Sequence, residues 1–137
     1  MASKTRVLFV CTNNAARSQL AEALLRFADS ERFEAFSAGT QPGEIDPRTF
    51  AALDHLGIET SGLRSKSLDE FADQRFDYVI TLCDKAAQEC QALPGAGELL
   101  AWNFEDPVTS DTHDAFRHTL HEIHERIKMF VLVKTKR

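Results

Sequence analysis

Val7–Ser18 reads VLFVCTNNAARS, so an apolar run stops at a cysteine and an arginine stands six positions further on. From Leu20 onward, apolar residues recur at the spacing of a helix. This order predicts a buried strand, a short loop and a helix. Backbone N–H groups of such a loop can point inward as a nest, and the helix N-terminus adds the positive end of its dipole. We therefore expect the loop to bind an oxyanion.

Cys11 and Arg17 are the candidate reactive residues of this loop. The Arg17 guanidinium can bind two anion oxygens at once, and the same positive field favours the thiolate of Cys11 over its thiol. Ser18 can donate a hydrogen bond to that thiolate. The alternative is that Cys11 is only a small apolar residue at the end of a buried strand, but the arginine, the small loop residues and the helix start favour the anion site. The residues expected to bind the oxyanion are Thr12, Asn13, Asn14, Ala15, Ala16, Arg17 and Ser18.

The composition predicts one cytoplasmic domain over residues 1–137, a length that can bury a core without a metal or a disulfide. The net charge of −5 argues against nucleic-acid binding, and no apolar run is long enough for a signal peptide or a membrane span. In a reducing compartment, three cysteines favour catalytic or metal use over a structural disulfide framework. We expect a monomer without a cofactor and without nucleic-acid or membrane partners.

The remaining pattern predicts an α/β fold in which strands alternate with helices. The four expected strands are Thr5–Cys11, Arg32–Ser37, Phe76–Leu82 and Glu98–Trp102. The continuous apolar run of the first strand is typical of a central strand in a parallel sheet, buried on both faces. The first expected helix follows Arg17 and runs to about Asp29, and the second runs from Pro47, behind an Asp46 N-cap, to about Gly57. A third, short helix is expected to begin at a Ser67–Glu70 capping box, and a long last helix should span Asp111–Val133.

A second cysteine, Cys83, comes directly after the strand Phe76–Leu82. Ligands bind at the carboxyl ends of strands in open α/β sheets, so we expect Cys83 and Cys11 to face one site. Cys90 follows Cys83 through residues that favour a helix, which would place their Cα atoms roughly 10 Å apart, whereas a disulfide needs less than about 7 Å. A disulfide between them would therefore require this segment to unwind. The spacing alone favours two helix cysteines that face the core over a redox pair.

Asp106 precedes a proline, which disfavours helical geometry at Asp106 and stiffens the turn. Such a turn can hold a carboxylic acid over a site. The residues alone favour the plainer interpretation, an ordinary Asp-Pro turn.

His121 and His124 lie three positions apart in the last expected helix, where a metal site would need a third ligand. No third ligand stands near them in a recognisable motif. We expect both histidines on the helix surface and no metal.

Cys-x5-Arg-Ser between a first strand and a first helix resembles the low-molecular-weight tyrosine phosphatase fold, which thioredoxin-coupled arsenate reductases also use. The segment Cys11-Thr-Asn-Asn-Ala-Ala-Arg17-Ser18-Gln19 is more similar to that of the reductases than to that of the phosphatases. The resemblance covers nearly the whole chain. It implies a three-layer sandwich with a central four-stranded parallel sheet flanked by helices. It also implies that Cys83 and Cys90 are a redox pair and that Asp106 is the general acid.

The function that the resemblance implies is arsenate reduction, as in arsenic resistance. Arsenate, for which phosphate and sulfate are analogues, would form an adduct with Cys11, and a disulfide would pass from Cys11–Cys83 to Cys83–Cys90 before thioredoxin or glutaredoxin reduces it. The alternative is a tyrosine or small-molecule phosphatase, which needs only Cys11, Arg17 and Asp106. A non-catalytic anion sensor or partner-binding module is a further possibility. A metal regulator is poorly supported by three scattered cysteines.

Two departures from the resembling reductases stand out. Many of them carry another cysteine just before the arginine, where this chain has Ala16. Some also bind a potassium ion beside the loop. Asn14, Glu22 and Ser37 match part of that ion site, but the expected acidic ligand is missing near Lys66. We expect no potassium ion, with Lys66 replacing its charge.

Overall fold

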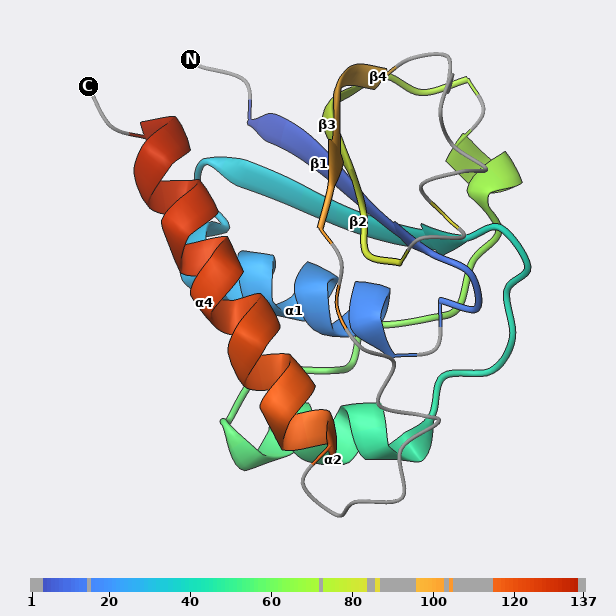
Figure 1. The fold of residues 1–137 in the computed structure, drawn as a ribbon, viewed down its shortest axis with the longest axis vertical. Helices are drawn as coiled ribbons and strands as arrows, with labels where there is room; N and C mark the ends of the chain where they lie inside the picture. Colours follow the sequence, from blue (N-terminus) through green and yellow to red (C-terminus); the bar gives the residue numbers. More distant parts are fainter. Residues whose placement is uncertain are drawn as a thin grey trace.

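Four parallel strands form one sheet in the order β2-β1-β3-β4 (Figure 1). The strands are β1 (Thr5–Cys11), β2 (Phe33–Gly39), β3 (Phe76–Thr81) and β4 (Ala96–Ala101). The computed structural model describes residues 4–14, 16–71, 73–83, 86, 96–102, 104 and 115–135. The expected α/β fold and parallel sheet are confirmed. The first strand is central because β2 and β3 pair with it on either side.

On one face of the sheet lie α1 (Arg17–Asp29) and α4 (Ala115–Thr135), and α2 (Pro47–His55) packs against these two helices on the side away from the sheet (Figure 1). The alternation of side chains along a strand sends Val7 and Phe9 to this face and Leu8 and Val10 to the other. On the second face, the described residues that cover the sheet include the 3-10 helix η1 (Leu68–Phe71).

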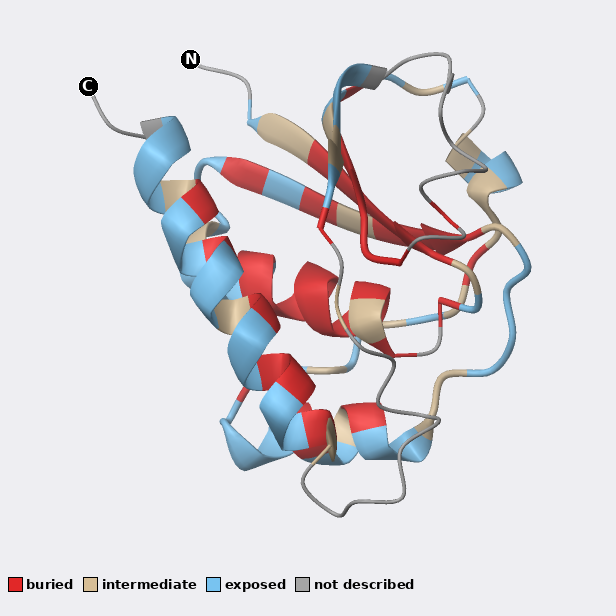
Figure 2. Ribbon diagram, viewed as in Figure 1, coloured by how far each residue is buried: buried red, intermediate tan, exposed pale blue. Residues whose placement is uncertain are grey.

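Burial follows these layers, as Figure 2 shows along β1, most of α1 and the inner side of α4. The inner side of α4 has the helical spacing that the sequence predicts. Its buried residues are Phe116, Leu120, Ile123, Ile127 and Phe130. Within the described part of the chain, none of the helices combines the length and apolar character that crossing a membrane requires.

The strand ends differ by one or two residues from the sequence prediction. β2 continues to Gly39 instead of Ser37, because Gly39 pairs with Cys11 at the end of β1. β3 ends at Thr81, one residue before the expected end. β4 covers Ala96–Ala101 rather than Glu98–Trp102, since Ala96 already pairs with β3.

The helix starts confirm one prediction and correct another. The Asp46 side chain accepts a hydrogen bond from Arg48 N at 2.9 Å, so Asp46 is the expected N-cap of α2. The expected short helix at Ser67 forms as one 3-10 turn, and Ser67 Oγ accepts from Asp69 N at 3.2 Å, but the Glu70 carboxylate pairs with Arg64 at 3.0 Å instead of completing the capping box. α4 is described from Ala115, so the expected start at residue 111 lies outside the described residues.

Candidate active site

The carboxyl ends of β1 and β3 bring two sulfur atoms together. Cys11 Sγ lies 3.8 Å from Cys83 Sγ, across 72 positions of sequence. Leu82 N donates to Val10 O at 2.9 Å, which extends the pairing of the two strands up to the cysteines. Both thiols are free and buried, with 4% of Cys11 and 9% of Cys83 exposed. The expected meeting of the two cysteines at one site is confirmed.

The loop after β1 presents its peptide groups with a defined polarity. The carbonyls of Cys11, Thr12 and Asn13 accept hydrogen bonds from the backbone N–H groups of residues 40, 41 and 43, at 3.3, 2.9 and 2.9 Å. In a trans peptide the N–H points opposite to the carbonyl. The next three N–H groups, of Thr12, Asn13 and Asn14, therefore point away from that segment. This is the arrangement that an anion-binding nest requires.

Asn14 holds the turn of this loop. Its φ of 53° is left-handed, a conformation that asparagine tolerates better than most residues. Its Nδ2 donates to Ser18 Oγ at 2.7 Å, Gln19 Nε2 donates to its Oδ1 at 2.9 Å, and Lys66 N donates to the same oxygen at 2.8 Å. Ser18 thus has Asn14 as a partner, and its bond to the Cys11 thiolate stays a prediction.

Arg17 opens α1, and the helix start has no side-chain cap, so its first N–H groups suit an anion. The Arg17 guanidinium donates to Phe104 O at 2.9 Å, beyond the end of β4. This bond joins the helix start to the chain that leaves the edge of the sheet. The arginine is thereby oriented before an anion binds, which supports its expected role.

Cys11 and Cys83 hold one proton between them. The hydrogen bond from Cys11 and a hydroxyl contact from Thr12 Oγ1 at 3.5 Å lower the pKa of Cys83 to about 5, against the effect of burial. The same hydrogen bond and burial raise the pKa of Cys11, and the opposing charge of Arg17 does not offset them. Without an anion, this hydrogen bond favours the thiolate on Cys83. The Cys11 thiolate that attacks the anion stays a prediction.

Behind the loop, Lys66 occupies the position where a cation would sit. Its Nζ lies 3.5 Å from Glu22 Oε1 and 3.5 Å from Ser37 Oγ, and it donates to Arg64 O at 2.7 Å. Burial lowers the pKa of Lys66, and Glu22 opposes that shift. The expectation that Lys66 supplies the charge at this point is confirmed. A potassium ion does not fit the site, since the ammonium already takes these oxygens and would repel it.

Three predicted site residues, Ala15, Cys90 and Asp106, lie outside the described residues. The helix expected between the second and third cysteines lies outside them too, apart from its residue 86. Their roles stay predictions. Among the described residues, no group of histidine, cysteine and acidic side chains could hold a metal ion, and His121 and His124 lie on the outer part of α4.

Comparison with known proteins decides the family. The model of the low molecular weight phosphotyrosine protein phosphatases matches residues 6–137. The chain belongs to this family. A relative from Halalkalibacterium halodurans, named an arsenate reductase, is 34% identical over an alignment of 133 positions, and the match covers 93% of this chain and 96% of that protein.

Solved structures of the phosphatase family extend the comparison. A thioredoxin-dependent arsenate reductase of Corynebacterium glutamicum is 33% identical with a TM-score of 0.75, and the match covers 96% of this chain and 62% of that longer one. A tyrosine phosphatase of Erwinia amylovora has a TM-score of 0.80, with 96% and 94% of the two chains covered. At 23% identity, the second likeness shows the shared fold alone.

Three features of this phosphatase-family site escape sequence reasoning. Gln19 buttresses Asn14, Thr12 contacts Cys83, and Gly39 lies against the loop, where an added Cβ would be 2.7 Å from Thr12 O. The last two depend on partners distant in the chain. A local signal for the first is Gln19 itself, a polar residue that lies fully buried in α1 next to apolar residues.

Proposed function

We propose that this protein reduces arsenate to arsenite and passes the resulting disulfide outward through its three cysteines. The 3.8 Å between the sulfurs of Cys11 and Cys83 carries the proposal. An adduct on Cys11 would have a second sulfur as its nearest nucleophile, whereas a phosphatase needs water there. The named arsenate reductases among the relatives support the same choice.

The first step forms the adduct. The N–H groups of the loop and the Arg17 guanidinium bind the arsenate oxygens and neutralise their charge. Cys11 attacks arsenic as its proton passes along the hydrogen bond to Cys83. One arsenate oxygen leaves as water after protonation, with Asp106 as the proposed acid. The product contains a bond between Cys11 sulfur and As(V).

The second step is the reduction. Cys83 loses its proton to solvent, its thiolate is stabilised by the Thr12 hydroxyl at 3.5 Å, and that thiolate attacks the sulfur of Cys11. A Cys11–Cys83 disulfide forms and the sulfur–arsenic bond breaks. The electron pair of that bond stays on arsenic, so As(V) becomes As(III) and arsenite leaves. The two sulfurs supply the two electrons.

The third step resets the site. The Cys90 thiolate attacks Cys83, which releases the Cys11 thiolate and leaves a Cys83–Cys90 disulfide. A dithiol protein then reduces this disulfide by the same exchange. We propose thioredoxin, because the similar Corynebacterium enzyme is described as thioredoxin-dependent. Glutaredoxin is the alternative donor.

A single replacement tests the proposal. We expect Cys83→Ser to abolish arsenate-dependent NADPH oxidation in the presence of thioredoxin and its reductase, because the adduct then lacks its resolving sulfur. Slow hydrolysis of an aryl phosphate should persist, since water rather than Cys83 then breaks the bond between Cys11 sulfur and phosphorus and releases phosphate. A parallel assay with glutaredoxin and glutathione identifies the donor. Full arsenate turnover by Cys83→Ser would reject the relay.

A further inference from the structure

Glu22 and Lys66 form a buried ion pair behind the anion loop, apart from the reacting residues. Only 1% of the Glu22 side chain and 7% of the Lys66 side chain are exposed, with 3.5 Å between Nζ and Oε1. The other Glu22 oxygen accepts from Arg26 at 2.8 Å, and the Arg26 side chain is 45% exposed. Glu22 is thus paired with two cations: buried Lys66, which we call the inner cation, and half-exposed Arg26, which we call the outer cation.

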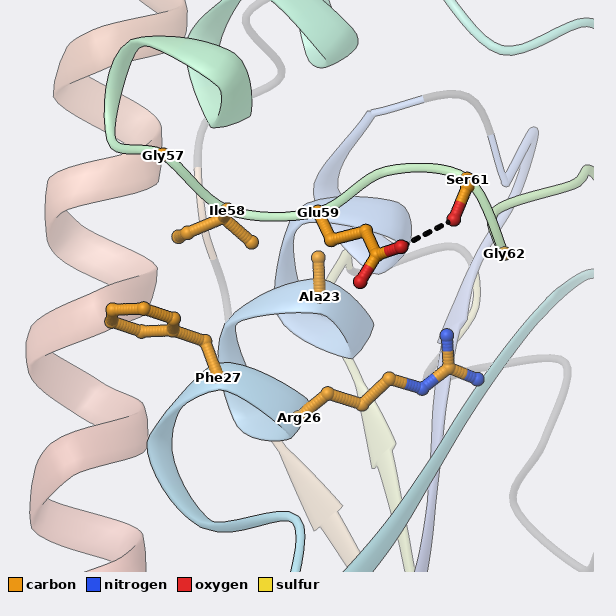
Figure 3. Close-up of a pocket in the computed structure, with 8 residues that line it drawn as sticks. All are labelled: Ala23, Arg26, Phe27, Gly57, Ile58, Glu59, Ser61 and Gly62. Carbon is orange, nitrogen blue, oxygen red and sulfur yellow. Dashed lines mark hydrogen bonds between the residues drawn. The ribbon is translucent and has the colours of Figure 1, made fainter.

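The outer cation belongs to a surface pocket and not to the loop. Arg26 lines a pocket of about 550 Å³ between α1 and residues 57–62, into which its side chain extends in Figure 3. Its guanidinium also donates to Ala35 O at 3.1 Å. Arg26 therefore neutralises Glu22 from the side that faces away from the anion loop, which makes it a suitable comparison for Lys66.

The inner cation braces the backbone that holds the loop. Lys66 Nζ donates to Arg64 O at 2.7 Å, which closes the turn over residues 64–66. Arg64 O also accepts from Gln19 Nε2 at 2.8 Å, and Lys66 N donates to Asn14 Oδ1 at 2.8 Å. Because Gln19 Nε2 also donates to Asn14 Oδ1, both contacts connect this turn to Asn14, whose φ is left-handed. Such a conformation persists only where the surroundings determine it.

We infer that Lys66 is a positioning residue of the anion loop, a built-in cation that takes the place of the potassium ion in resembling reductases. Its ammonium joins Glu22 of α1, Ser37 of β2 and Arg64 O into one cluster. This cluster holds Lys66 N in place, the backbone group that donates to Asn14 Oδ1. The inference rests on the proposed function, because it concerns the loop that would bind arsenate.

The test compares Lys66→Met with Arg26→Met by calorimetric binding of inorganic phosphate. Each variant removes one cation from Glu22, but only Lys66→Met removes the brace on Arg64 O. We expect about tenfold weaker phosphate binding for Lys66→Met, with a matching rise in KM for arsenate and a smaller change in kcat. Arg26→Met should stay within about twofold of the wild type, since its ion pair is half-exposed.

A cation rescue separates positioning from general stability. Lys66→Ala leaves room among the Glu22 carboxylate, the Ser37 hydroxyl and Arg64 O, and hard cations prefer oxygen ligands. We expect ammonium or potassium chloride to restore its phosphate affinity, and choline chloride at the same ionic strength to have no effect. Lys66→Met fills the space and should not respond.

Two results would overturn the inference: equal phosphate affinity of wild type and Lys66→Met, or equal effects of ammonium and choline on Lys66→Ala. If Lys66→Met does not fold, the double variant Glu22→Gln/Lys66→Met removes both buried charges and is measured instead. It should fold and still bind phosphate weakly, and wild-type affinity in it would also refute the inference. Failure of the proposed function appears elsewhere, as a wild-type protein that binds phosphate and reduces no arsenate.

Discussion

At the scale of single residues, the distribution of one proton between two sulfurs governs reactivity. Cys83 accepts hydrogen bonds from Cys11 and Thr12, so its pKa falls to about 5 and it is a thiolate at neutral pH. Cys11 is the donor in this pair and keeps its proton until it attacks. The same contact therefore lets Cys83 accept the Cys11 proton in the first step, and Cys83 must lose this proton before it attacks in the second.

Thr12→Val removes the hydroxyl that stabilises the Cys83 thiolate. We expect the pKa of Cys83 to rise from about 5 toward its ordinary 9.0, because hydrogen bonds to the charged form lower a thiol pKa. The thiolate fraction at neutral pH should fall, and arsenate turnover should need a higher pH. Ultraviolet absorbance of the thiolate as a function of pH measures the shift. Thr12→Ser keeps the hydroxyl and is the control, and an unchanged titration in Thr12→Val would contradict the assignment.

At the scale of elements, the site depends on how closely the end of β2 approaches the loop between β1 and α1. Gly39 pairs with Cys11, and its N–H donates to Lys66 O at 2.8 Å. One residue thus joins the end of β1 to the turn that holds Asn14. A Cβ at this position would lie 2.7 Å from Thr12 O, which is backbone and cannot move alone.

Gly39→Ala should displace the anion loop. We expect a loss of about 1–3 kcal/mol in the free energy of unfolding and clearly weaker phosphate binding, because an overpacked contact with backbone forces a shift. Urea denaturation and calorimetry measure the two effects. Gly43→Ala is the matched control, since a Cβ there meets nothing within 4 Å. Similar results for both variants would show that the close approach does not matter.

At the scale of the whole molecule, a sheet packed on both faces keeps the site rigid. β1 is fully buried over Val7–Val10, with α1 and α4 over one face and η1 on the other. α1 carries Arg17 at its start, and α4 packs along it. The packing of α4 therefore stabilises the helix from which the anion is bound.

Ile127→Ala tests this packing, because Ile127 is fully buried on α4. We expect the free energy of unfolding to fall by about 2–5 kcal/mol, from lost burial and the cavity left behind. Leu132→Ala on the same helix should cost about 0.5 kcal/mol or less, since Leu132 is 63% exposed. Urea denaturation compares the two, and equal losses would show that α4 is not anchored through this face.

Features that depend on neighbours in the chain could be predicted from the amino-acid pattern. The apolar run that ends at Cys11, the Asp46 N-cap and the spacing along α4 are short-range signals, and all three elements form as predicted. The position of Arg17 at the start of α1 follows in the same way. At Ser67 only half of the capping box forms, because the Glu70 carboxylate pairs with Arg64, six positions earlier in the chain.

Which distant residues meet depends on how the strands and helices pack. The 3.8 Å contact of Cys11 with Cys83, the lowered pKa of Cys83, and the brace from Lys66 to Asn14 each depend on segments separated by tens of residues. For the contact of Cys11 with Cys83, the sequence predicted only that both cysteines lie at the carboxyl ends of strands, at one edge of the sheet. Distances, burial and shared protons arise when strands and helices pack, because they depend on atoms that no local pattern relates.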